Sequence, residues 1–158
     1  MENITDENLI SLLKEKFPDF IPYWKPYVEY WGMDQGLTIQ ITPFSEYVLD
    51  VIKSKKESEL EDIFDFVEFL ICNGNDSVQT TMTTSFLEDL LSRAPTEINF
   101  STFAKYLGKE SKEYCKAWDR FCGMRTEGLW DDEKTTKWKW LRSFKQLIAR
   151  FAKKTHLF

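Results

Sequence analysis

Residues 57–93 have the sequence ESELEDIFDFVEFLICNGNDSVQTTMTTSFLEDLLSR, in which apolar side chains recur every three or four positions on both sides of the turn Asn73-Gly-Asn-Asp76. This spacing is typical of amphipathic helices. We therefore predict one helix over 58–74 and a second over 76–93, arranged as a HEAT-like pair. The second helix contains a run of threonines, whose hydroxyls we expect to donate hydrogen bonds to carbonyls one turn back.

Helix-start signals and Gly or Pro stops divide the rest of the chain in the same way. Ser58 followed by Glu61, and Asp76 followed by Gln79, match the capping box that opens a helix. The other predicted helices cover 6–17, 23–31, 42–55, 101–107, 111–121 and 132–154. The short stretch 38–42 alternates as a strand does, but it is too short to build a sheet. We expect an all-α fold, either an irregular helical bundle or a short HEAT-like superhelix of about eight helices.

The composition is that of one globular domain. The 158 residues are 42% hydrophobic and 30% charged, with 13 Phe, 6 Trp and 6 Tyr. No stretch approaches the ~20 apolar residues of a membrane span, and residues 1–9 lack the basic and apolar regions of a secretion signal. Cys72, Cys115 and Cys122 are an odd number without CxxC spacing, which predicts buried, reduced thiols. We therefore expect a cytoplasmic protein.

Charge is divided unevenly along the chain. Residues 134–158 hold eight Lys or Arg and no Asp or Glu, whereas the preceding 133 residues hold 13 basic and 26 acidic side chains. We therefore divide the chain into an acidic all-helical body, residues 1–131, and a basic amphipathic C-terminal helix, residues 132–158, called the basic tail below. Such asymmetry bears on partners and association more than on fold.

The basic tail separates apolar from cationic side chains when its residues are placed about 100° apart on a helix. Its cationic side consists of Lys139, Arg142, Lys145, Arg150, Lys153 and Lys154. This pattern predicts a closing helix that packs on the body. The alternatives are an anionic membrane surface, nucleic acid or the groove of a partner protein. The acidic body would be repelled by lipid and nucleic-acid phosphates, which disfavours the first two.

Two surfaces of the body are candidates for binding a partner. Four acids of the helix predicted over 58–74 fall on one narrow stripe, where like charges on adjacent turns repel one another. This stripe consists of Glu57, Glu61, Asp65 and Glu68. It is either a solvated face or a contact surface for a basic partner. The helix predicted over 23–31 is dense in aromatic residues, and we expect some of Tyr23, Trp24, Tyr27 and Trp31 to anchor such a contact.

Residues that perform catalysis are scarce. The single histidine, His156, lies two residues from the end of the chain, where fraying is expected. This placement removes Ser-His, Cys-His and His-metal arrangements from any ordered cleft. None of the six glycines belongs to a phosphate-binding loop. We therefore expect no enzymatic activity, no cofactor and no metal site.

Two stretches resemble a known family. The first is Asn73-Gly-Asn-Asp-Ser-Val-Gln79 leading to Ser85-Phe-Leu-Glu88. The second contains Tyr106-Leu-Gly108, Ser111, Tyr114-Cys115, Trp118-Asp119, Phe121 and Gly128-Leu-Trp130. Together they resemble small bacterial helical proteins that form a domain family of unknown function, over residues 8–130. The resemblance implies a helical fold and a relationship to immunity proteins of polymorphic toxins, and it names no active site. The basic tail departs from the family's usual ending.

These observations favour a non-catalytic protein-binding module, namely an immunity protein that neutralises a basic toxin. One alternative is a nucleic-acid- or membrane-associated regulator that acts through the basic tail. A third hypothesis is a structural scaffold that self-associates through the aromatic helix 23–31. The sequence does not identify the partner or the oligomeric state.

Overall fold

The computed structural model of this chain describes residues 4–94 and 96–130. The basic tail lies outside the described residues. The predicted packing of its helix on the body, and the positions of its cations, therefore stay predictions.

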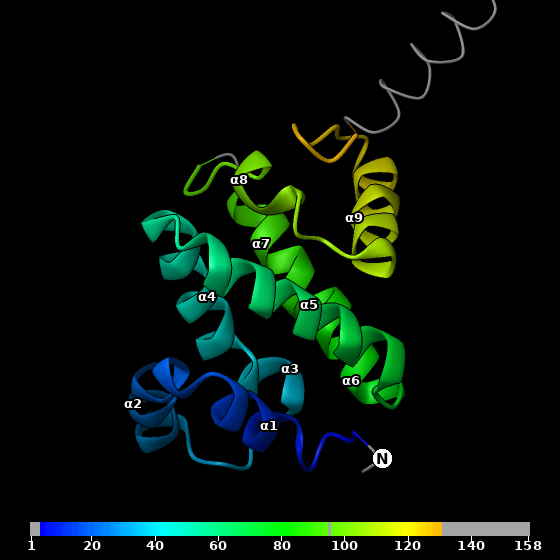
Figure 1. The fold of residues 1–158 in the computed structure, drawn as a ribbon. Helices are drawn as coiled ribbons and strands as arrows, with labels where there is room; N and C mark the ends of the chain where they lie inside the picture. Colours follow the sequence, from blue (N-terminus) through cyan, green and yellow to red (C-terminus); the bar gives the residue numbers. More distant parts are fainter. Residues whose placement is uncertain (1–3, 95, 131–158) are drawn as a thin grey trace, which may run out of the picture.

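The described residues form an all-α fold, as the helical spacing predicts (Figure 1). In chain order, its elements are α1 (Leu9–Lys16), the 3-10 turn η1 (Pro18–Phe20), α2 (Ile21–Trp31), α3 (Leu37–Gln40), α4 (Thr42–Ser54), α5 (Glu57–Asn73), α6 (Asp76–Thr80), the π-helical segment η2 (Thr81–Leu87), α7 (Glu88–Arg93), α8 (Ser101–Ala104) and α9 (Lys109–Cys122). Elements α1 to α3 lie at one end of the molecule and α8 and α9 at the other, with α5 crossing the middle (Figure 1).

The helices on either side of the turn between α5 and α6 form the predicted pair, but the residues that cap their starts differ from the predicted ones. Asn75 caps α6, because its Oδ1 accepts a hydrogen bond of 3.0 Å from the backbone N of Val78. The cap residue of α6 is therefore Asn75, and not Asp76 as the sequence pattern predicts. Helix α5 begins at Glu57 without any side-chain cap, so the Ser58 capping box is wrong. A matching residue pattern alone does not fix which residue takes the non-helical backbone conformation of a cap.

Elements α6, η2 and α7 follow one another without a break and make up the helix predicted over 76–93. The threonine hydroxyls bond one turn back, as expected. Thr83 Oγ1 donates to the carbonyl of Gln79, and Thr84 Oγ1 donates to the carbonyl of Thr80, both at 2.8 Å. The middle of this helical run is π-helical, which widens the turn locally.

Phenylalanine supplies the largest fully buried side chains of the core, namely Phe20, Phe44, Phe64, Phe86 and Phe103. The rings of Phe64 on α5 and Phe103 on α8 stack at 5.1 Å, and those of Phe44 on α4 and Phe86 on η2 lie 5.3 Å apart. Helix α5 thus contacts α8 through Phe64, and its Phe66 ring meets that of Phe17, just after α1, at 5.8 Å, while one of its sides stays on the surface.

Candidate functional site

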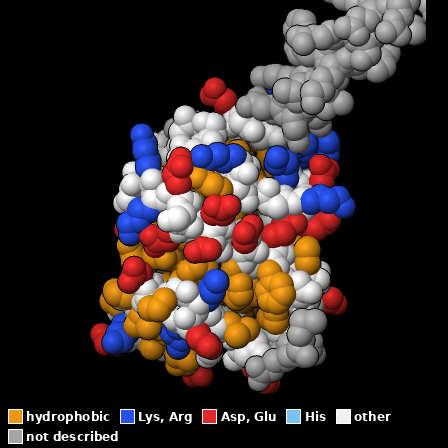
Figure 2. Space-filling model, in the orientation of Figure 1, with side chains coloured by type: hydrophobic (Ala, Val, Ile, Leu, Met, Phe, Trp, Pro, Cys, Tyr) orange, Lys and Arg blue, Asp and Glu red, His pale blue; other side chains and the backbone are white. Residues whose placement is uncertain are grey.

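The outer side of α5 presents exposed carboxylates beside exposed aromatic surface. Glu61, Asp62 and Asp65 are exposed, and none of the three makes a salt bridge with any described residue. Phe69 is 40% exposed, and its ring stacks on half-buried Phe66 at 5.9 Å. These five residues are called the α5 face below. Figure 2 shows acidic side chains in a row across the middle of the molecule, where Figure 1 places α5.

The predicted acidic stripe is divided by the structure. Glu61 and Asp65 belong to the α5 face, whereas Glu57 and Glu68 serve contacts within the protein. Glu57 forms a salt bridge of 3.0 Å with Lys105, just after α8. The predicted stripe omitted Asp62, because this residue lies about 100° around the helix from Glu61. In the structure, exposed Asp62 belongs to the α5 face. Its exposure on the far side of Phe69 depends on which elements pack against α5.

Glu68 caps helix α9 from another helix. Its Oε1 accepts a hydrogen bond of 2.7 Å from the backbone N of Glu110. Its Oε2 accepts hydrogen bonds from the backbone N and the Oγ of Ser111, at 2.9 and 2.6 Å. Partial burial raises the pKa of Glu68, but the hydrogen bonds from Ser111 and Glu110 and the charge of Lys109 outweigh it, so that the pKa lies below its ordinary value. Glu68 is therefore a structural carboxylate and not the solvent-facing member of a stripe.

Gly108 makes this cap possible. It is the N-cap residue of α9 and offers no side chain of its own to the free backbone N–H groups. A Cβ at position 108 would lie 2.2 Å from Cδ of Glu68, which no real packing allows. The close approach of the Glu68 side chain to the backbone at position 108 explains why a glycine stands before Ser111 in the resemblance motif.

The aromatic residues predicted on α2 have different surroundings. Trp24 is 5% exposed and packs on Phe20, so it is a core residue and not a surface anchor. The helix turns that side chain towards the body, which its aromatic density could not reveal. Tyr23 is half-buried and donates a hydrogen bond of 2.8 Å to Asp50. Tyr27 is also half-buried, and its hydroxyl donates to the carbonyl of Ile39 at 2.9 Å.

Trp31 belongs to an exposed apolar group at the end of α2. This group, called the aromatic tip, consists of Tyr30, Trp31, Met33 and Ile39. Tyr30 is 79% exposed, and its ring lies 4.9 Å from that of Trp31. Gln35 donates a hydrogen bond to the carbonyl of Trp31, and Gln40 donates to the carbonyl of Met33, each at 3.1 Å. These bonds tie the backbone of the tip to residues 35 and 40, at the end of the molecule away from α8 and α9 (Figure 1).

A buried carboxylate fixes the loop that follows α9. Asp119 is fully buried and accepts three hydrogen bonds of 2.7 Å, from the backbone N and Oγ1 of Thr126 and from Nε1 of Trp130. The guanidinium groups of Arg120 and Arg125 lie over the Trp130 ring at 4.9 and 5.0 Å. Residues of the second resemblance motif are thus a packing unit, and this part of the surface is cationic.

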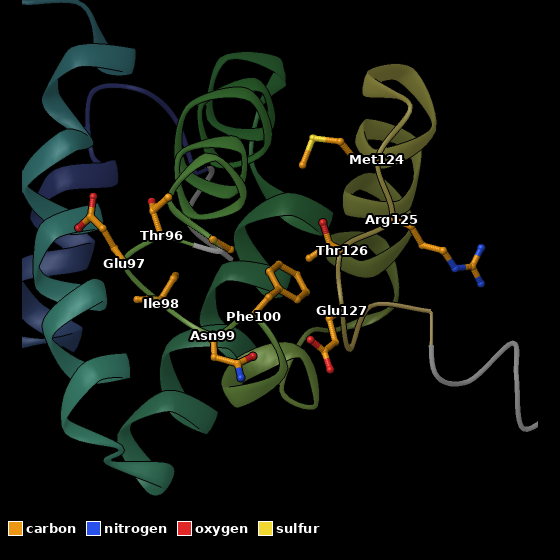
Figure 3. Close-up of a pocket in the computed structure, with 10 residues that line it drawn as sticks. Thr96, Glu97, Ile98, Asn99, Phe100, Met124, Arg125, Thr126 and Glu127 are labelled. Carbon is orange, nitrogen blue, oxygen red and sulfur yellow. The ribbon is translucent and has the colours of Figure 1, made fainter.

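A cleft of about 530 Å³ opens between the loop after α7 and the loop after α9 (Figure 3). Two of its polar side chains have partners: Glu97 forms salt bridges with Lys53 and Arg93, and Asn99 Oδ1 accepts from the backbone N and Oγ of Ser101. The Arg125 side chain points away from the cleft (Figure 3). Glu97 and Asn99 therefore serve contacts within the protein.

Other functional features are few in the part of the chain that the structure describes. Within it, no three His, Cys, Asp or Glu side chains are grouped as ligands for a metal ion. No helix there has both the length and the apolar character needed to cross a bilayer. Cys115 is buried, but Cys72 and Cys122 are exposed, so the prediction of buried thiols is wrong for these two. Both lie in the last turn of a helix.

The chain was compared with known protein families, curated proteins and solved structures. A family model described as a domain of unknown function (DUF7674) matches residues 10–123, from the first turn of α1 through the whole of α9. No curated protein and no solved structure matches the chain significantly. The match includes the α5 face, Glu68 and the aromatic tip, and it confirms the resemblance to a domain family of unknown function. The chain therefore belongs to the DUF7674 family.

Proposed function

We propose that this protein is a non-catalytic binding module that recognises a basic protein through the α5 face. The observation that carries the proposal is the set of three exposed carboxylates without ion-pair partners among the described residues, next to 40% exposed Phe69. Like charges on adjacent turns of a helix destabilise it slightly, and an opposing cationic surface removes that cost. An apolar centre with a charged rim is a common arrangement of protein interfaces.

The two parts of the α5 face have different tasks in this proposal. The carboxylates of Glu61, Asp62 and Asp65 attract a cationic partner and speed its encounter, since complementary charge acts mainly on the association rate. Phe69 then supplies apolar contact area, which acts mainly on the dissociation rate. The aromatic tip is a second preformed apolar surface, and Tyr and Trp are enriched among residues that dominate binding energy.

More specifically, we propose that the protein is an immunity protein that neutralises a basic toxin in the cytoplasm. An acidic body suits this task, because a toxin that acts on nucleic acid carries the opposite charge. The three cysteines are unpaired thiols in the structure, which fits a reducing compartment. Glu97 and Asn99, which line the cleft, serve contacts within the protein, which fits a role in binding.

Charge reversal on the α5 face tests the proposal. The full chain is immobilised and exposed to lysate of its own host with nuclease added, as wild type and as the Glu61→Lys, Asp62→Lys, Asp65→Lys variant. A matched control carries the same charge change at exposed acids elsewhere, Glu7→Lys, Glu15→Lys and Glu127→Lys. Wild type and control should retain one basic protein that the first variant loses. Equal retention by both variants would remove the α5 face from the mechanism.

Experiments with the retained protein then test the immunity role. Its association rate with the wild-type chain should fall as salt rises, and the α5-face variant should associate slowly at every salt concentration. Expression of the retained protein alone should arrest growth of a host, and co-expression of this chain should restore it. Growth that is normal without this chain would reject the immunity role.

A further inference from the structure

We propose that the basic tail of this chain occupies the α5 face of the same molecule and competes there with the basic partner. The docking itself stands on the described surface and on the sequence of the tail. The competition rests in addition on the proposed function. The occupant is therefore a defined segment, residues 132–158, and the place is a defined side of one helix.

The α5 face is a helix side that the described residues leave without a partner. Along one edge, Glu57 pairs with Lys105 and Glu68 caps α9, so the segment from α8 to α9 borders the face. Along the other edge, the ring of Phe66 meets that of buried Phe17 at 5.8 Å. Between these edges lie the exposed Phe69 ring and the carboxylates of Glu61, Asp62 and Asp65.

The tail has the complementary composition. Residues 134–158 contain eight Lys or Arg and no Asp or Glu. Placed on a helix, its apolar residues cover about half of the circumference and its cations the other half. The apolar half contains Trp140, Leu141, Phe144, Leu147, Ile148, Phe151 and Ala152. An amphipathic segment of this kind offers an apolar strip for Phe66 and Phe69 and cations for the acids on either side of them.

Charge favours the α5 face over the apolar surface at the end of α9 as the docking place of the tail. There Phe121 is 85% exposed and Met124 is 47% exposed, close to the last described residue. Arg120 directly precedes Phe121 and Arg125 directly follows Met124 in the chain, and their guanidinium groups lie over Trp130. A segment with eight cations is repelled there, whereas the carboxylates of the α5 face attract it.

The point at which the tail leaves the described chain favours the α5 face over the aromatic tip as its docking place. The described chain ends at Trp130, and Gly128 just before it packs against Ser101 at the start of α8. Phe103 of α8 in turn stacks on Phe64 of α5, so the chain end and the middle of α5 belong to the same half of the molecule. The remaining 28 residues would span roughly 40 Å as a helix, against about 25 Å for α5 with its 17 residues. The aromatic tip lies at the opposite end of the molecule (Figure 1).

A tethered occupant changes how the partner binds. A segment joined by a short connection acts at an effective concentration of about millimolar. The partner then binds only the fraction of molecules whose face is open, and its apparent Kd rises by the inverse of that fraction. Neutralising cations of the tail should therefore tighten binding of the partner without any change in the α5 face.

Zero-length cross-linking of the full chain tests the docking. A carbodiimide joins a lysine to a carboxylate only where the two side chains touch. In the monomeric product, peptide mass spectrometry should find Lys139 and Lys145 joined to acids of the α5 face. A variant with Glu61→Gln, Asp62→Asn and Asp65→Asn should lose these links and keep all others, and its circular dichroism should match the wild type. Raising the salt concentration should lower the yield of these links.

Three results would overturn the docking. Links from the tail to Glu29 and Asp34 beside the aromatic tip, or to Glu113 and Glu127 near α9, would place it elsewhere. Links to the α5 face that occur only in the dimeric product would assign the face to a second copy of the chain. An absence of tail links in the monomer would leave the face open. None of these results affects capture of the basic partner by the full chain, so the docking and the proposed function can fail separately.

Discussion

Replacing Glu68 with Ala should destabilise the whole protein, although the residue is half-buried and lies on the same helix as the exposed acids. The carboxylate accepts three hydrogen bonds from the first turn of α9, at donor–acceptor distances of 2.6 to 2.9 Å. Loss of a helix N-cap costs about 0.5–2 kcal/mol. The buried hydroxyl of Ser111 would also lose its partner, and a buried unsatisfied polar group costs about 1–3 kcal/mol. Because these contributions overlap and water reaches part of the site, we expect a loss of about 2–3 kcal/mol.

The dependence on pH separates this cap from a packing effect. The pKa of Glu68 in the folded protein lies below its ordinary value of 4.5. The ionised carboxylate therefore stabilises the fold above pH 4.5, and this stabilisation is lost as the pH falls through the folded-state pKa. The difference in unfolding free energy between wild type and Glu68→Gln should be full at pH 7 and should shrink at pH values below 4.5.

Urea denaturation followed by circular dichroism measures these differences, with Glu61→Ala as the control on an exposed turn of the same helix. That control should stay within about 0.5 kcal/mol of wild type, as surface substitutions do. Gly108→Ala should also destabilise the wild type, because its Cβ would lie 2.2 Å from Glu68 Cδ, and should cost less in the Glu68→Ala background. Equal stability of the Glu68→Ala and Glu61→Ala variants, or additive effects of the Gly108 and Glu68 substitutions, would refute the cap.

The loop after α9 and the three thiols give two further predictions. Asp119→Asn should cost about 2–4 kcal/mol in urea denaturation, because an amide group cannot accept from all three donors at 2.7 Å. Glu127→Gln, at an exposed position of the same loop, should be close to neutral, and an equal loss in both variants would contradict this role of Asp119. In the native protein, a thiol reagent at pH 8 should modify Cys72 and Cys122 but reach Cys115 only on unfolding, because burial, reinforced by Asp119, raises the pKa of Cys115 to about 12. Rapid reaction of all three thiols would contradict the buried position of Cys115.

The helices could be predicted because apolar spacing is a local property. The pair 58–74 and 76–93, and the ends of α2 and α9 at glycine, follow from residues only a few positions apart. Helix starts were less reliable, because several residues near a start can match a cap pattern while one of them takes the cap conformation. Asn75 does so although Asp76 matches the pattern better.

The candidate site was only half predictable, because exposure depends on elements that are distant in the chain. Glu68 bonds to residues 42 and 43 positions further along, and nothing near it in the sequence signals that contact. Trp24 is buried because α2 packs against η1 and α4, whereas Trp31 on the same helix extends beyond them. A periodic pattern separates the two sides of a helix, but it does not show which partner covers each side.

The two roles of acids on α5 decide how a binding experiment must be designed. Glu61, Asp62 and Asp65 make no ion pair within the described residues, so changing them alters the field outside the protein and leaves the helix contacts intact. Glu68 lies one turn further along, but its loss would release α9 and, with it, the loop that Asp119 holds. A variant that reversed the four acids of the predicted stripe would therefore combine unfolding with loss of charge. Lost binding in the Asp62 and Asp65 variants, with retained stability, is the result that isolates recognition.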